Sequence, residues 1–140
     1  MKSGPIVLID DDIDDQEVFA DILKELEVLN TLICFDNSKA GLEYLTKTTD
    51  QPFLIFCDVN LPGEKGTEFK RQIDADPALR KKSIPFVFYS TAINQDVVNE
   101  AYTEMTVQGF FQKKSSYDAI RENIRLIIAY WKECQHPNAI

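Results

Sequence analysis

The sequence predicts a doubly wound α/β fold in which helices cover both faces of one parallel sheet. Short apolar runs alternate five times with longer amphipathic stretches, which is the order of successive βαβ units. The runs are apolar almost throughout, as strands buried on both faces are. They lie at residues 6–9, 31–35, 53–57, 86–89 and 109–112. Because 140 residues suit one domain, we expect a single domain over 1–140, with a core at about 5–131 and a short tail at 132–140.

The stretch between the first two runs is the clearest helix, because its apolar residues recur every three or four positions. These residues are Val18, Phe19, Ile22, Leu23, Leu26 and Leu29. Asp14, with Glu17 three residues later, predicts a capping box at the start of this helix. The last helix shows the same spacing from Ile120 to Trp131, and Ser115 or Ser116 is expected as its N-cap.

Three further helices are expected over residues 38–46, 67–75 and 94–105, where fewer apolar residues mark one face. Residues 76–85 begin with Asp-Pro and end with Ile-Pro, so they are expected to form a connector. The run Arg80-Lys81-Lys82 within it is interpreted as solvated surface rather than as a binding patch.

Charge and rare residue types exclude several classes of function. Fifteen Lys and Arg against 23 Asp and Glu give a net charge of −8, so direct nucleic-acid binding is not expected. The longest apolar run has six residues, whereas a membrane span needs about 20, so a soluble, cytoplasmic protein is expected. One His, three widely spaced Cys and the lack of a glycine-rich phosphate loop leave no triad, zinc centre or common nucleotide cradle.

Polar side chains follow four of the five predicted strands. Asp10, Asp11 and Asp12 follow the first, Asp58 the third, Ser90 and Thr91 the fourth, and Lys113 the fifth. The carboxyl ends of parallel strands meet at one edge of the sheet, where ligands bind in open α/β folds. Crowded carboxylates repel one another unless they share a cation, and oxygen-only ligands at an open edge suit Mg²⁺. An aspartate can also attack phosphorus, with a lysine and a hydroxyl contacting the phosphoryl oxygens.

Each of these residue types also has an ordinary structural interpretation. Acids before a helix are favoured by capping and by the helix dipole, and an Asp before a Pro-Gly turn is normal turn chemistry. Hydroxyls at strand ends commonly form caps or turns, and an isolated lysine is usually solvated. The coincidence of all four groups at strand ends favours a functional site.

The motifs at these strand ends together resemble those of the CheY-like receiver domain of two-component response regulators. The matching segments are Ile-Asp-Asp-Asp, Cys-Asp-Val-Asn-Leu-Pro-Gly, Tyr-Ser-Thr and Gly-Phe-Phe-Gln-Lys. The resemblance covers about residues 5–131 and implies a flavodoxin-like (βα)5 fold with strand order 2-1-3-4-5. The triple Asp, the Leu-Pro-Gly turn and the Asp-Pro-x-Leu segment are further similar to stand-alone receivers of the cyanobacterial phytochrome partner type.

The resemblance implies roles for the residues of the predicted site. Asp58 would be the phosphoacceptor, and Mg²⁺ would be held by Asp10, Asp11, Asp58 and the backbone carbonyl of Asn60, with Asp12 outside this set. Ser90 would be the switch hydroxyl, with Thr91 as the alternative one residue further on. Lys113 would bond to the phosphoryl group, and Phe110 would be the aromatic residue that moves inward with the switch.

One position departs from the family pattern, because Lys114 stands where receivers usually have a proline after the lysine, often with a cis bond. A cis bond to a non-proline residue costs about 3 to 4 kcal/mol. Either that strain is held here, or the loop after Lys113 takes another path.

The function implied is that of a single-domain response regulator, a phosphoacceptor rather than a turnover enzyme, served by a sensor histidine kinase or a histidine phosphotransfer protein. Its output would be protein binding through residues 94–105, 109–112 and 115–131, without direct nucleic-acid or membrane contact. The partner on this face would be a downstream protein target or a second copy of the chain in a homodimer. Tyr102, Phe110 and Tyr117 are candidate anchors on that face.

Two alternatives belong to other classes of function. One is a receiver-like binding module that works without phosphorylation. The other is a Mg²⁺-dependent phosphatase with an aspartate nucleophile. Phosphatases of the haloacid-dehalogenase kind usually have a second Asp two residues after the nucleophile. In this sequence that position is Asn60, which disfavours the phosphatase alternative.

Overall fold

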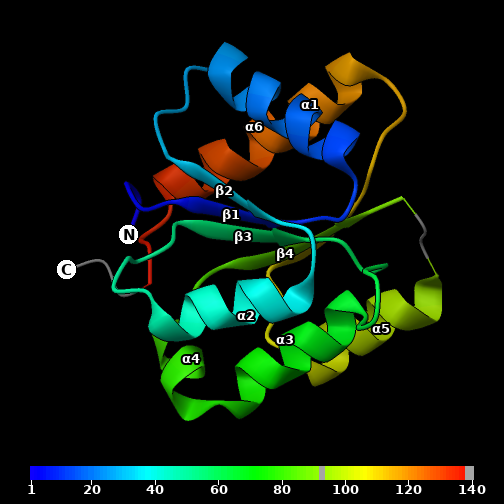
Figure 1. The fold of residues 1–140 in the computed structure, drawn as a ribbon. Coiled ribbons are helices and arrows are strands. Elements are labelled where there is room, and N and C mark those ends of the chain that lie inside the picture. The colour runs from blue at the N-terminus through cyan, green and yellow to red at the C-terminus, as the bar shows by residue number, and fades with distance from the viewer. Residues whose placement is uncertain (92–93, 138–140) are drawn as a thin grey trace.

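A five-stranded parallel sheet forms the centre of the computed structural model, which describes residues 1–91 and 94–137 (Figure 1). The strand order is β2-β1-β3-β4-β5, which confirms the predicted fold. The strands are β1 (Ile6–Ile9), β2 (Leu32–Phe35), β3 (Leu54–Cys57), β4 (Phe86–Ser90) and β5 (Gly109–Gln112). The helices are α1 (Ile13–Glu25), α2 (Ser38–Lys47), α3 (Gly66–Ala75), α4 (Pro77–Lys82), α5 (Gln95–Glu104) and α6 (Tyr117–Glu133).

The helices lie in two layers, with α1 and α6 on one face of the sheet and α2, α3, α4 and α5 on the other (Figure 1). Side chains alternate between the two faces along each strand. In β1, Ile6 and Leu8 pack toward α1 and α6, whereas Val7 and Ile9 pack toward the opposite layer. Fully buried phenylalanines fill both sides of the sheet: Phe53, Phe56, Phe69, Phe86 and Phe88. The continuous burial of β1 and β3 explains why these two central strands are apolar throughout, whereas the edge strands β2 and β5 are only partly buried.

Helix α1 begins and ends earlier than the sequence predicts. Its N-cap is Asp12 rather than Asp14, since the Asp12 carboxylate accepts hydrogen bonds from two first-turn amides at 2.9 and 3.2 Å. The helix ends at Glu25, and Leu26 still packs against the core. Leu29 lies beyond the helix and is 96% exposed, so its assignment to the apolar face is wrong.

The predicted connector at residues 76–85 contains a short helix, α4. The Asp76 carboxylate accepts from two first-turn amides at 2.9 and 3.4 Å, and Pro77 occupies the first helical position, where a missing N–H costs nothing. Leu79 is buried and anchors the helix to the core. Because of α4, the helix expected over residues 94–105 is α5, and the last helix is α6, with Ser116 as its N-cap.

The C-terminal segment is packed against the domain as far as it is described. His136 is only 7% exposed, and its Nε2–H donates to the carbonyl of Phe53 at 2.7 Å. The imidazole also lies 5.4 Å from the Phe53 ring, measured between ring centroids. Of the predicted tail at 132–140, residues 138–140 lie outside the described part of the chain.

Cys34, Cys57 and Cys134 are all free thiols; Cys57 is buried, and the other two are half-buried. Within the described ranges, no helix is long and apolar enough to cross a membrane.

Candidate functional site

Two buried carboxylates stand side by side at the carboxyl edge of the sheet because β1 and β3 are neighbours in parallel register. Asp10 and Asp58 each follow the last residue of their strand. Their backbones continue the ladder, since the Asp10 amide donates to the Phe35 carbonyl at 3.0 Å and the Asp58 amide donates to the Ile9 carbonyl at 2.9 Å. The exposed fractions of the two side chains are only 2% and 11%, so both acids are largely withdrawn from water.

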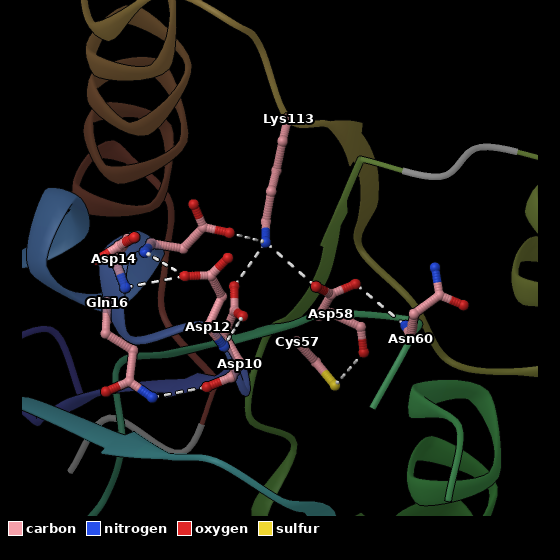
Figure 2. Close-up of polar contacts among 9 residues, drawn as sticks. Asp10, Asp12, Asp14, Gln16, Cys57, Asp58, Asn60 and Lys113 are labelled. Atoms are coloured by element: carbon pink, nitrogen blue, oxygen red, sulfur yellow. Dashed lines mark hydrogen bonds and ion pairs between the residues drawn. The ribbon is translucent and has the colours of Figure 1, made fainter. Parts of the chain in front are cut away.

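Lys113 brings a positive charge to these acids from the end of β5. Figure 2 shows its side chain reaching down between Asp10 and Asp58. Its Nζ lies 2.6 Å from Asp10, 2.8 Å from Asp15 and 3.2 Å from Asp58, in each case from Oδ2. The Lys113 amide donates to the Ser90 carbonyl at 2.9 Å, which fixes the backbone from which the side chain extends. A buried cation thus compensates two buried anions, as burial of charge requires.

The ionisation of these groups follows from burial and pairing. Burial raises the pKa of Asp10, and the hydrogen bonds from Lys113 and from the Asp12 amide partly offset that rise. Burial alone would lower the pKa of Lys113, but its hydrogen bonds to Asp10 and Asp15 outweigh burial, and the pKa lies above its ordinary value. Lys113 therefore carries its full charge at neutral pH.

A group of carboxylate oxygens at this edge fits a divalent cation. Asp10, Asp11 and Asp58 each offer an oxygen, and these oxygens lie within 4.8 Å of one another. Asp10 and Asp58 are buried and Asp11 is exposed, so the set opens toward solvent on one side. Oxygen-only ligands with an open side suit Mg²⁺, which keeps water and takes a phosphate oxygen. Asp12 serves as the N-cap of α1 and does not belong to the set.

Asn60 lies where the chain leaves β3. Its amide donates to Asp58 Oδ1 at 3.1 Å, and its side chain points away from that carboxylate (Figure 2). The residue itself is exposed. The hydrogen bond orients the Asp58 side chain from the backbone of the following loop.

The predicted switch residues lie on β4 and β5. Ser90 is fully buried, and its hydroxyl has no hydrogen-bond partner among the described residues, whereas Thr91 is exposed. A buried hydroxyl without a partner is costly, so Ser90 is available to a group that enters the site. Phe110 is partly buried, with its ring 5.3 Å from that of Phe88. The structure joins Ser90 to Lys113 through the backbone, but not through the two side chains.

The segment after β3 packs closely against the backbone of Asp58. A Cβ added to Gly66 would lie 2.2 Å from the Asp58 carbonyl oxygen, a distance that atoms do not tolerate. The same carbonyl accepts a hydrogen bond from the buried Cys57 thiol at 3.2 Å (Figure 2). Gly63, with φ of +79°, makes the turn that returns the chain to α3. Gly66 therefore has a steric reason that concerns the position of Asp58, whereas Gly63 is explained by its backbone conformation.

The loop after β5 has a trans peptide bond at the position where Lys114 replaces the usual proline. No cis peptide bond occurs in residues 1–91 or 94–137, so the bond between Lys113 and Lys114 is trans. The chain takes another path and still delivers the Lys113 ammonium to the acids.

Asp15 is a member of the site that the sequence did not indicate. Its ion pair with Lys113 joins residues 98 positions apart in the chain. The early start of α1 after β1 places its first turn at the sheet edge, but that turn holds two acids, Asp14 and Asp15, and the sequence does not distinguish which one faces Lys113.

Comparison with known structures places this geometry among response regulators. The phosphorylated cyanobacterial phytochrome response regulator RcpA is 25% identical with a TM-score of 0.86, and the match covers 96% of this chain and 99% of that one. The Mn²⁺-bound response regulator Rcp1 is 26% identical with a TM-score of 0.84, covering 97% and 99%. The receiver domain of the Pseudomonas aeruginosa sensor histidine kinase PA1611, with Mg²⁺ in its active site cleft, has a TM-score of 0.72 at 17% identity, covering 92% and 97%.

The sequence itself matches the response regulator receiver domain over residues 6–125, whereas no curated protein matches it. The chain therefore belongs to the response regulator receiver family of two-component signalling. Receivers of this family are signalling phosphoacceptors that bind Mg²⁺ in the active site and obtain the phosphoryl group from histidine kinases or phosphotransfer proteins. The family and the fold predicted from the sequence are thus confirmed.

Proposed function

We propose that this protein accepts a phosphoryl group on Asp58 from a sensor histidine kinase or a histidine phosphotransfer protein. The observation that carries the proposal is the shared position of Asp58, which lies both in the cation-capable set and within 3.2 Å of the Lys113 ammonium. A carboxylate nucleophile thus has, on two sides, the charges that a phosphoryl group needs.

In the proposed step, an Asp58 carboxylate oxygen forms a bond to phosphorus as the bond from phosphorus to the donor's histidine nitrogen breaks. The electron pair of the broken bond stays on that nitrogen. Lys113 stands beside Asp58, where its ammonium can donate to a phosphoryl oxygen, and the Asn60 amide keeps the carboxylate oriented. The buried Ser90 hydroxyl, which lacks a partner, would then turn toward the new phosphoryl group.

We propose that Mg²⁺ is held by the carboxylates of Asp10, Asp11 and Asp58 together with the carbonyl of Asn60. The spacing of the three carboxylates supports this ligand set. When bound, Mg²⁺ would neutralise charge on the phosphoryl oxygens and so favour attack by an anionic nucleophile.

The output proposed for the phosphorylated state is binding of a protein partner through α5, β5 and α6. Tyr102 on α5 and Tyr117 on α6 are 53% and 40% exposed, so both can contact a partner, although the Tyr117 hydroxyl also donates to Glu25 at 2.9 Å. Phe110 on β5 packs against Phe88 on β4, the strand that ends at Ser90. The face formed by α5, β5 and α6 is compatible with either a second copy of this chain or a separate protein target.

Intact-protein mass spectrometry tests the proposal. The wild type, Asp58→Asn and the control Asp36→Asn, which removes an exposed acid outside the site, are incubated with Mg²⁺ and acetyl phosphate. One phosphoryl adduct is expected in the wild type and the control, and none in Asp58→Asn or without Mg²⁺. A folded wild type that forms no adduct would refute the phosphoacceptor role and leave a binding module that works without phosphate. Continuous release of phosphate from small phosphoesters would point to a phosphatase instead.

A further inference from the structure

The Lys113 ammonium has three carboxylate partners, and one of them plays no part in the cation-capable set. Asp10 and Asp58 pair with Lys113 and also belong to the group of oxygens that can hold a metal ion. Asp15 contacts Lys113 at 2.8 Å and does not belong to that group. The lysine therefore has one anionic partner that a cation bound by the set does not share.

We propose that Asp15 is a positioning residue that holds Lys113 in place for phosphoryl transfer. The inference rests on the function proposed above and concerns the moment when Asp10 and Asp58 are engaged by a cation and a phosphoryl group. A cation among those carboxylates repels the ammonium and weakens the two pairs it shares. Asp15 then provides the remaining fixed negative charge for Lys113.

Packing alone does not hold the ammonium. A cavity of about 60 Å³ adjoins it, lined in part by Asp10, Asp15, Tyr89 and Lys113. This volume exceeds what one water molecule needs, so the end of a four-carbon side chain has room to move. The Tyr89 hydroxyl is buried in this region and has no hydrogen-bond partner in the described part of the chain. An electrostatic contact is therefore needed to fix the ammonium, and Asp15 makes one.

Asp15 is itself placed by rigid elements. It lies in the first turn of α1, where its amide donates to the N-cap carboxylate of Asp12 at 3.2 Å. The Lys113 backbone is held at the other end by its bond to Ser90 on β4. The ion pair thus spans from the start of α1 to the end of β5 and sets where the lysine side chain stops.

Two consequences follow when the Asp15 charge is removed. Lys113 loses its unshared partner and pairs fully with Asp10 and Asp58, where it competes with Mg²⁺. The ammonium is also displaced from the place where a phosphoryl oxygen arrives. Because the Asp15 side chain is 41% exposed, its contribution is that of a partly solvated pair, and we expect about a fivefold effect.

The experiment compares Asp15→Asn with Asp14→Asn, which removes the neighbouring acid of the same helical turn and the same charge. With saturating Mg²⁺ and acetyl phosphate, Asp15→Asn is expected to form the adduct about fivefold more slowly, and Asp14→Asn to stay within about twofold of the wild type. Equal rates in the two variants would overturn the inference. Thermal melts of both proteins separate a positioning effect from a loss of folded protein.

A double-mutant cycle on Mg²⁺ affinity then tests whether Asp15 acts through Lys113. Calorimetry on the wild type, Asp15→Asn, Lys113→Ala and the double variant is expected to show weaker Mg²⁺ binding from Asp15→Asn only when Lys113 is present. The same loss in both backgrounds would mean that Asp15 acts on the ion directly and would overturn the inference. If the wild type forms no adduct, the proposed function fails and the inference with it; an adduct without coupling rejects the inference alone.

Discussion

Replacement of Lys113 by alanine provides the strongest test of how the site is held together. The substitution removes the cation that compensates Asp10 and Asp58, whose side chains are 2% and 11% exposed. Without it, two buried carboxylates face each other at the end of adjacent strands. We therefore expect the metal-free protein to lose stability.

The size of the loss follows from burial. Removal of one partner of a buried ion pair costs about 3 to 5 kcal/mol, because the other charge stays buried and uncompensated. The third partner, Asp15, is 41% exposed and partly hydrated, so the lower end of the range applies. We expect a decrease of about 3 kcal/mol in the free energy of unfolding. With a urea slope of about 2 kcal/mol per molar, the midpoint falls by about 1.5 M.

Urea unfolding in EDTA, followed by the fluorescence of Trp131, the one tryptophan in the sequence, measures this change. Lys114→Ala is the matched control, because that lysine is the next residue and is exposed, and its effect should stay within about 0.5 kcal/mol. Added Mg²⁺ should stabilise Lys113→Ala more than the wild type, since the ion meets no competing ammonium. At a hundred times its Kd, such an ion contributes about 2.7 kcal/mol.

Two results would refute the electrostatic reasoning. One is a Lys113→Ala protein as stable in EDTA as the control. The other is a failure of Asp10→Asn to recover stability in the Lys113→Ala background, because removal of one unpaired charge should restore at least half of the loss.

Three further predictions concern the supports of the site and the C-terminal segment. Gly66→Ala should lower stability by at least about 2 kcal/mol and impair adduct formation, since the new Cβ would meet the Asp58 carbonyl at 2.2 Å; urea unfolding and intact mass measure both effects. Asp12→Ala should cost about 1 kcal/mol through loss of the α1 N-cap, seen as a lower urea midpoint with adduct formation retained. Burial lowers the pKa of His136 below its ordinary 6.5, so the unfolded chain binds the proton first as the pH falls. The contribution of His136 to the free energy of unfolding should be complete above a pH of about 6.5 and should decrease as the pH falls below that value. In His136→Gln, whose side chain can still donate to the Phe53 carbonyl, the free energy of unfolding should decrease less between pH 7.5 and 5.5.

Each of these has an outcome that contradicts it. An adduct rate in Gly66→Ala equal to that of the wild type would mean that the loop can yield without moving Asp58. An unchanged midpoint in Asp12→Ala would place the start of α1 elsewhere, for example at the capping box that the sequence predicted. A pH dependence that survives intact in His136→Gln would assign it to other groups.

Much of the fold was predictable because its signal is local. Each strand is a short, mostly apolar run that lies within one residue of its predicted bounds, and β1 and β3, which are fully buried, are apolar throughout. Helix α4 was not predicted because its six residues include only one buried side chain, which is too few to show a helical hydrophobic period. Its signal was the Asp-Pro pair, an N-cap followed by proline, which also occurs in turns. At α1, Glu17 three residues after Asp14 led the sequence prediction to the wrong cap, because Asp12, two residues earlier, is the N-cap.

The residues of the site were likewise predictable only in part. That Asp10, Asp58 and Lys113 meet at one edge follows from parallel topology, because each directly ends a strand. Asp15 in the site, and His136 outside it, were missed because their contacts depend on the rotation of α1 and on the docking of the C-terminal segment, which no strand end fixes. Sequence reasoning thus reaches groups placed by strand ends and fails for groups placed by helix rotation or by the docking of a terminus.

The burial of the Cys57 thiol leaves the Asp58 carboxylate as the nucleophile that an electrophile can reach at this edge of the sheet. Cys57 directly precedes Asp58, yet strand alternation turns its side chain into the core beneath the sheet, where it is fully buried. Burial and the nearby charges of Asp58 and Asp10 raise the pKa of the Cys57 thiol, so the reactive thiolate is scarce. Burial and the charge of Asp10 also raise the pKa of the Cys34 thiol, which packs against the core. Maleimide or iodoacetamide should therefore modify the half-buried Cys134 before Cys57, so a fluorescent dye can be attached at the end of α6 with native Cys57 retained.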